Sequence, residues 1–101
     1  MSEEVRTLGF ELDVQSIYER LDLWEEGTGE TFYSHVLKTI EVLLRNPLLG
    51  KVVFADRVRR ILVYNRNYGL FYTVEPRGIV LHALLDLRTN PERIGHRLRQ
   101  I

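Results

Sequence analysis

The spacing of apolar residues changes near the middle of the chain, and this change restricts the possible folds most strongly. In residues 13–26 and 30–45, apolar side chains recur every three or four positions, as on one face of an α-helix. Asp13 is a suitable N-cap for the first helix, and Gly27-Thr28-Gly29 separates the two. Two amphipathic helices with so short a connection form an antiparallel hairpin whose apolar stripe needs a second layer.

The second half of the chain supplies that layer. Short apolar runs alternate with turn residues at 65–67 and 75–78, which predicts strands that pair as an antiparallel meander. Thr89-Asn90-Pro91-Glu92 is typical of a helix start and predicts a short C-terminal helix. We therefore expect one α+β domain over residues 1–101, an antiparallel sheet with an N-terminal helical hairpin packed on one face. The predicted strands are residues 5–10, 51–54, 58–64, 69–74 and 79–85.

Composition excludes several classes of protein. The chain has no cysteine, which excludes disulfides and zinc–thiolate sites. The first residues are acidic and lack the apolar segment of a signal peptide. The longest apolar runs fall far short of the ~20 residues that span a bilayer. These features predict a cytoplasmic protein without membrane association.

Charge is distributed unevenly along the chain although the net charge is zero. Residues 1–44 carry ten Asp and Glu against three Lys and Arg, a net charge of −7. Residues 45–101 carry eleven Lys and Arg against four Asp and Glu, a net charge of +7. A basic sheet beside acidic helices favours contact with phosphate groups or with an acidic partner.

The strand predicted at 58–64 carries adjacent arginines. Because side chains alternate between faces, Arg60, Leu62 and Tyr64 are expected on one face and Arg59, Ile61 and Val63 on the other. Guanidinium groups among aromatic rings suit phosphates and exposed bases. The alternative is that these arginines only pair with the acidic helices. The candidate target- or nucleic-acid-binding residues are Arg59, Arg60, Tyr64, Arg66, Tyr72, Asp86 and Arg88.

Other chemistry has little support in the sequence. His35, His82 and His96 lie on three different predicted elements and have no spacing of metal ligands, and only His82 in the sheet is a candidate to line a site. The chain has no Gly-rich phosphate loop or nucleophile motif. Asp86 lies at a strand end, where a structural contact with Arg88 is the simplest role. We expect no metal and no cofactor.

Four segments in this order resemble the RelE/ParE toxin superfamily over about residues 5–98. They are Arg45-Asn46-Pro47-Leu48-Leu49-Gly50, Arg59-Arg60-Ile61-Leu62-Val63, the run from Tyr68 to Val74, and the run from Ile79 to Pro91. The resemblance implies a bacterial toxin of a toxin–antitoxin module, often described as a plasmid-stabilisation protein. It further implies growth inhibition, which a cognate antitoxin protein suppresses.

Two activities occur in that superfamily. RelE-like members cleave messenger RNA at the ribosome, and the resemblance places Arg60 and Arg88 where these nucleases have catalytic basic residues. ParE-like members inhibit DNA gyrase instead. Here Gly69 stands where the nucleases often have arginine, and no tyrosine follows Arg88 to transfer a proton. The resemblance therefore favours a ParE-like gyrase inhibitor. The alternatives are a metal-independent, ribosome-dependent endoribonuclease and an inactive member that only binds its antitoxin.

Overall fold

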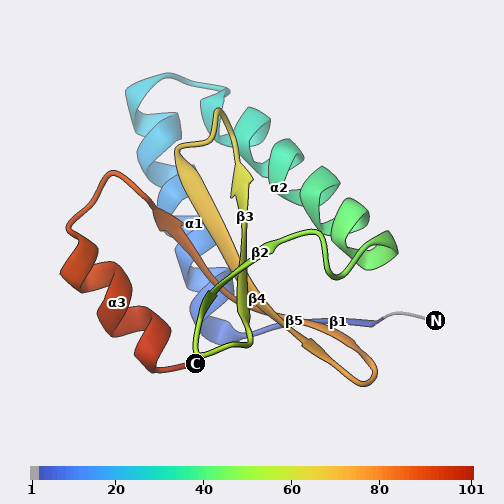
Figure 1. Cartoon of the computed structure of the whole chain (residues 1–101). Coiled ribbons are helices and arrows are strands. Elements are labelled where there is room, and N and C mark those ends of the chain that lie inside the picture. The colour runs from blue at the N-terminus through green and yellow to red at the C-terminus, as the bar shows by residue number, and fades with distance from the viewer. Residues whose placement is uncertain (1–2) are drawn as a thin grey trace.

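The computed structural model describes residues 3–101, which form three helices and one five-stranded sheet (Figure 1). The α+β class and the helical hairpin before a meander of strands are confirmed. None of the helices in residues 3–101 is long and apolar enough to cross a membrane. The elements are β1 (Glu3–Arg6), α1 (Leu8–Trp24), α2 (Thr28–Arg45), β2 (Lys51–Phe54), β3 (Val58–Val63), β4 (Tyr68–Glu75), β5 (Gly78–Asp86) and α3 (Pro91–Arg99).

The sheet has the strand order β1-β5-β4-β3-β2. Strands β2 to β5 form the expected antiparallel meander, whereas β1 pairs in parallel with the first half of β5. In the register of β4 with β5, Phe71 lies opposite Ala83 and Tyr72 opposite Leu81, so that His82 is an extra residue in β5. This bulge shifts the alternation of side chains along β5.

The beginning of α1 differs from the prediction. The first strand ends at Arg6 rather than extending to residue 10, and the N-cap is Thr7 rather than Asp13. Thr7 Oγ1 accepts a hydrogen bond from Phe10 N at 3.1 Å and donates one to Leu81 O at 3.1 Å. Because this hydroxyl satisfies an amide of the first turn and also contacts β5, it fixes the helix start beside the sheet.

A three-residue connection joins α1 and α2 into the predicted hairpin. Asp22 Oδ1 accepts from the amides of Gly27 and Gly29, at 3.1 and 2.9 Å. Gly27 has the left-handed φ of 92°, and a Cβ at Gly29 would lie 2.8 Å from Tyr18 O. Glycine at these positions permits the tight turn and the close approach of the two helices.

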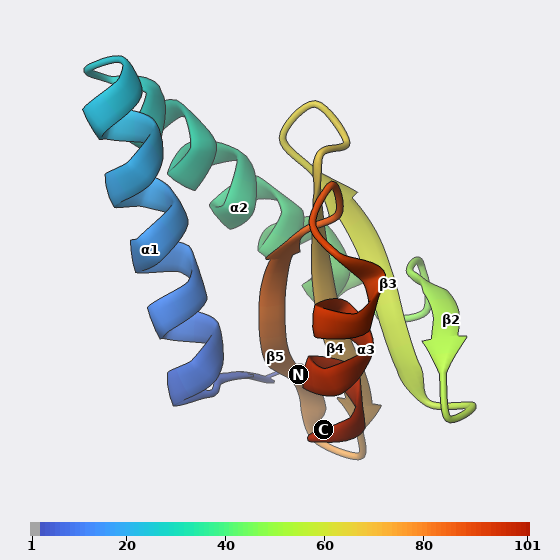
Figure 2. The same cartoon turned by 90° about the vertical axis from the view of Figure 1, so that its left-hand side faces the viewer.

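The hairpin covers one face of the sheet, and Figure 2 shows both helices on the same side of the strands. The main core lies between these layers. Its buried members are Phe10, Val14 and Ile17 of α1, Phe32, Val36, Ile40 and Leu43 of α2, and Val63, Tyr68, Leu70, Tyr72, Ile79, Leu81 and Leu84 of the sheet.

The opposite face of the sheet has its own cover. Phe71 points away from the hairpin, because it alternates with the core residues Leu70 and Tyr72. It is buried in a second, smaller core with Leu98 of α3 and with Val58 and Ala83, flanked by Ile94 and Ile101. The helix α3 therefore partly closes the face of the sheet that the hairpin leaves uncovered.

Candidate functional site

Arg59 anchors the loop before β2. Its Nη1 donates to Gly50 O at 2.7 Å and to Leu48 O at 3.1 Å. Arg59 is paired with Tyr72 across the sheet and so lies on the hairpin face. Its contacts are with backbone carbonyls rather than with acidic side chains, which makes its observed role the positioning of residues 48–50.

Arg60 lies on the other face, opposite Phe71. The side chain crosses Gly69, where an added Cβ would lie 3.2 Å from Arg60 Cδ. Its Nε is buried and has no hydrogen-bond partner in the described part of the chain. An unpartnered buried donor is uncommon and costs about 1–3 kcal/mol. Arg60 therefore keeps hydrogen-bonding capacity that the fold does not use.

Arg88 binds its near neighbour Asp86. Its Nε and Nη2 donate to Asp86 Oδ1 and Oδ2, both at 2.9 Å, and the Arg88 amide also donates to Oδ1 at 2.9 Å. The side-chain hydrogen bonds from Arg88 lower the pKa of the Asp86 carboxyl. The guanidinium carbon lies 5.7 Å from the ring centroid of Tyr68. The pairing expected from sequence is thus present, and the Arg88 side chain is still 60% exposed.

Arg60 and Arg88 have different surroundings. Arg60 shares the α3 face of the sheet with Phe71. Arg88 lies against Tyr68, whose ring belongs to the core on the hairpin face. Neither guanidinium is in contact with the other within residues 3–101: that of Arg88 is held by Asp86, and Arg60 Cδ lies over Gly69.

Tyr72 is not a surface residue, and its prediction as a target-binding side chain is wrong. It is 0% exposed. Its hydroxyl donates to Pro47 O at 2.7 Å and accepts from Gly50 N at 2.8 Å. Burial raises the pKa of this hydroxyl. Tyr72 ties the end of α2 to the sheet.

Alternation predicts that Tyr64 shares a face with Arg60, and this prediction is wrong. The strand ends at Val63, and Tyr64, Asn65 and Arg66 have the left-handed φ values of 52°, 56° and 67°. This turn directs the Tyr64 ring onto Phe32 and His35 of α2, with ring centroids 5.8 and 5.6 Å apart. Arg66 lies exposed in the same turn.

His82 is partly buried on the α3 face. Its Nε2 lies 2.9 Å from Thr73 Oγ1. Burial is the main cause that lowers the pKa of its imidazole, and nearby Arg57 acts in the same direction, whereas Glu75 raises it. The neutral ring is therefore favoured. Within residues 3–101 no three His, Asp or Glu side chains lie close enough together to hold a metal ion.

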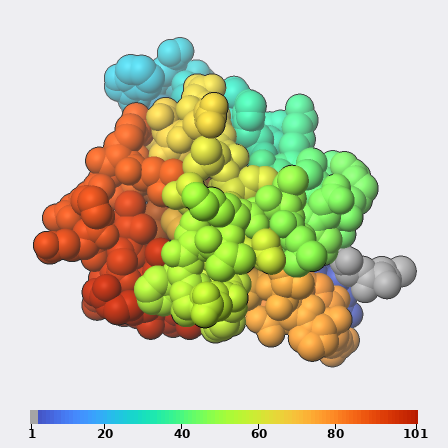
Figure 3. All heavy atoms as spheres, in the orientation of Figure 1, coloured from blue at the N-terminus to red at the C-terminus, as the bar shows by residue number. Residues whose placement is uncertain are grey.

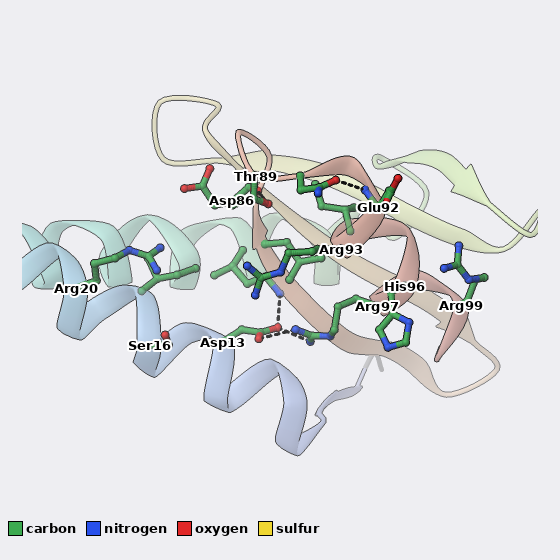
Figure 4. Close-up of a pocket in the computed structure, with 15 residues that line it drawn as sticks. Asp13, Ser16, Arg20, Asp86, Thr89, Glu92, Arg93, His96, Arg97 and Arg99 are labelled. Carbon is green, nitrogen blue, oxygen red and sulfur yellow. Dashed lines mark hydrogen bonds and ion pairs between the residues drawn. The ribbon is translucent and has the colours of Figure 1, made fainter.

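A groove of about 730 Å³ lies between α1 and α3, above the end of β5 (Figure 4). Arg97 Nη1 and Nη2 donate to Asp13 Oδ1 and Oδ2 at 2.9 and 2.7 Å, and this ion pair connects the two helices. Asp13 Oδ2 also accepts a hydrogen bond from Leu84 N at 3.0 Å. Strand β1 pairs with β5 only as far as Leu81 and does not pair with Leu84. Arg20 of α1 and Arg93 of α3 face the groove. The sequence signal for this site was the repeat of Arg93 and Arg97 four residues apart, which puts both on one side of a helix.

Comparison with known proteins identifies the fold. No protein-family model and no curated protein matches the sequence. A chain in the solved structure described as "Chromosomal ParDE TA system from P. aeruginosa" superposes with a TM-score of 0.76 at 13% sequence identity. The alignment covers 87% of this chain and 98% of that chain. The expected RelE/ParE-like architecture is thereby confirmed at the level of the fold.

Proposed function

We propose that this protein is the toxin of a toxin–antitoxin module and that it inhibits DNA gyrase by binding it, without cleaving RNA. The fold shared with a chain of a ParDE system supports the first part. The pairing of the Arg88 guanidinium with both carboxylate oxygens of Asp86 supports the second, and it is the observation on which the proposal depends.

Metal-free cleavage of RNA needs groups that move a proton and groups that stabilise the negative charge of the transition state. Several donors must then surround one phosphate. Here the Arg88 guanidinium is bound by Asp86, and the Nε of Arg60 is buried in the sheet layer beside Gly69. No tyrosine follows Arg88 in the sequence. A protein that acts by binding alone needs no such convergence.

The cognate antitoxin is proposed to bind through an amphipathic segment with acidic side chains. Exposed apolar residues for such contact lie near the β2 edge of the sheet, at Leu48, Leu49 and Val52, beside the cationic Lys51. An added strand or helix there would cover both the apolar surface and the free strand edge.

The proposal is tested by inducing expression of the protein in a culture. Transcript integrity and plasmid supercoiling are measured in that same culture. We expect growth arrest, loss of negative supercoiling and intact transcripts. Arg60→Ala and Arg88→Ala should not change transcript integrity, and Arg45→Ala, an exposed charge on α2, is the matched control. Cleaved transcripts that disappear in the Arg60 and Arg88 variants would support the ribosome-dependent endoribonuclease instead. Harmless expression with retained antitoxin binding would identify an inactive member.

A further inference from the structure

The last turn of α1 carries the most exposed large apolar side chains in the described part of the chain. Leu23 is 89% exposed and Trp24 is 82% exposed. Glu25 and Glu26 follow directly and are also exposed. We call these four residues the acidic tip, which projects at the top of the space-filling view (Figure 3). An apolar pair with acidic neighbours, left in water, indicates a contact surface.

The groove between α1 and α3 has the complementary chemistry. The apolar residues Ile17, Leu84 and Ile94 are among those that line it. Arg20 stands on the α1 wall and Arg93 on the α3 wall (Figure 4). We call these five residues and the space between them the basic groove.

The charges of the basic groove are not balanced within the molecule. Asp13 and Asp86, two carboxylates that also line the space, form ion pairs with Arg97 and Arg88. Within residues 3–101, Arg20 and Arg93 form no ion pair. Glu92 is a third carboxylate and lies in the first turn of α3. The guanidinium groups of Arg20 and Arg93 are thus available to an acidic ligand.

The groove fits a peptide better than a nucleic acid. No Phe, Tyr or Trp is among the residues that line it, so bases would lack a stacking platform. Its volume of about 730 Å³ lies in the range of sites that hold a small organic ligand, which is the size class of a leucine and a tryptophan side chain together. A peptide with large apolar side chains and flanking acids matches both features.

We propose that the acidic tip of one copy occupies the basic groove of a second copy, and that the contact is reciprocal. Within residues 3–101 the tip carries the two most exposed large apolar side chains, and two acidic residues follow them directly. Glu25 and Glu26 of the tip are opposite in charge to Arg20 and Arg93 of the groove, so the two surfaces attract each other. Each copy has one tip and one groove, so a two-fold dimer satisfies both. This inference is independent of the proposed function.

The single tryptophan of the chain is a direct reporter, because it lies in the tip. Light-scattering mass and Trp24 fluorescence are measured on the purified chain over a range of concentrations. We expect the mass to rise from monomer to dimer while the emission shifts to shorter wavelength. Added salt should reverse both changes, since the contact is partly ionic.

Charge reversal tests the two surfaces separately. Arg93→Glu makes the groove acidic, and the double substitution Glu25→Arg with Glu26→Arg makes the tip basic. Each variant alone should dimerise at least about tenfold more weakly. An equimolar mixture should recover the dimer, because acidic groove meets basic tip and basic groove meets acidic tip. Lys38→Glu, on an exposed position of α2, is the control and should dimerise as the parent does.

Three results would each overturn the proposal. The first is a monomer at every concentration with Trp24 emission typical of water. The second is a dimer that either charge reversal leaves unchanged, which would place the interface elsewhere. The third is a mixture of the two variants that stays monomeric.

Discussion

Replacing Tyr72 by phenylalanine removes one buried oxygen, and the structure sets the size of the effect. The hydroxyl is fully buried, donates to Pro47 O at 2.7 Å and accepts from Gly50 N at 2.8 Å. A buried hydrogen bond contributes about 1 kcal/mol net, and a buried amide left without an acceptor costs about 1–3 kcal/mol. We therefore expect Tyr72→Phe to lower the free energy of unfolding by about 2–4 kcal/mol.

Urea unfolding followed by circular dichroism measures this loss. The midpoint should fall while the dependence of the free energy on urea stays constant, since the surface exposed on unfolding hardly changes. Hydrogen exchange should speed up at the Gly50 amide. The matched control is Tyr64→Phe, because the Tyr64 hydroxyl has no hydrogen bond within residues 3–101 in the structure. Equal losses in the two variants, or a loss below about 0.5 kcal/mol in Tyr72→Phe, would refute the reasoning.

Three further predictions concern polar contacts. Asp13→Ala leaves Leu84 N and the Arg97 guanidinium without their acceptor, so the free energy of unfolding in urea should fall by about 2–3 kcal/mol. An unchanged free energy of unfolding would contradict these contacts. The pKa of Asp86 is lowered from 3.8, so its contribution to stability is present above 3.8 and lost as the pH falls through the folded-state pKa. Thermal melts of Arg88→Ala should lack that acid dependence, and an unchanged dependence would refute the assignment. The pKa of His82 is lowered from 6.5, so protonation should destabilise the fold as the pH drops below 6.5. NMR titration of the ring checks this, and a pKa above 6.5 would exclude it.

Periodicity was sufficient to predict the helical hairpin and the meander, because each depends on local spacing and short turns. The start of α1 was placed too late because Asp13 is a good capping residue in isolation. In the fold, the helical spacing begins at Phe10, and Asp13 faces Leu84 and Arg97 instead. Leu84 is 71 positions and Arg97 84 positions away from Asp13 in the sequence. Contacts over such separations produce no local sequence pattern.

The errors at the candidate site have a related cause. Alternation assigns faces correctly along β3, but it fails at Tyr64, where left-handed backbone ends the strand. Tyr72 was assigned to the surface because sequence does not say which face of the sheet the hairpin covers. The sequence predicts the apolar stripe of α3. The burial of Phe71 beneath that stripe depends on tertiary packing, which the sequence pattern does not give.

A supercoiling assay with purified protein and purified DNA gyrase tests the central claim most directly. We expect the chain to inhibit supercoiling in a dose-dependent way, and Arg60→Ala to inhibit as strongly as the parent because no phosphate needs to be held between Arg60 and Arg88. Undisturbed gyrase activity, together with ribosome-dependent cleavage of messenger RNA by the same preparation, would contradict the account.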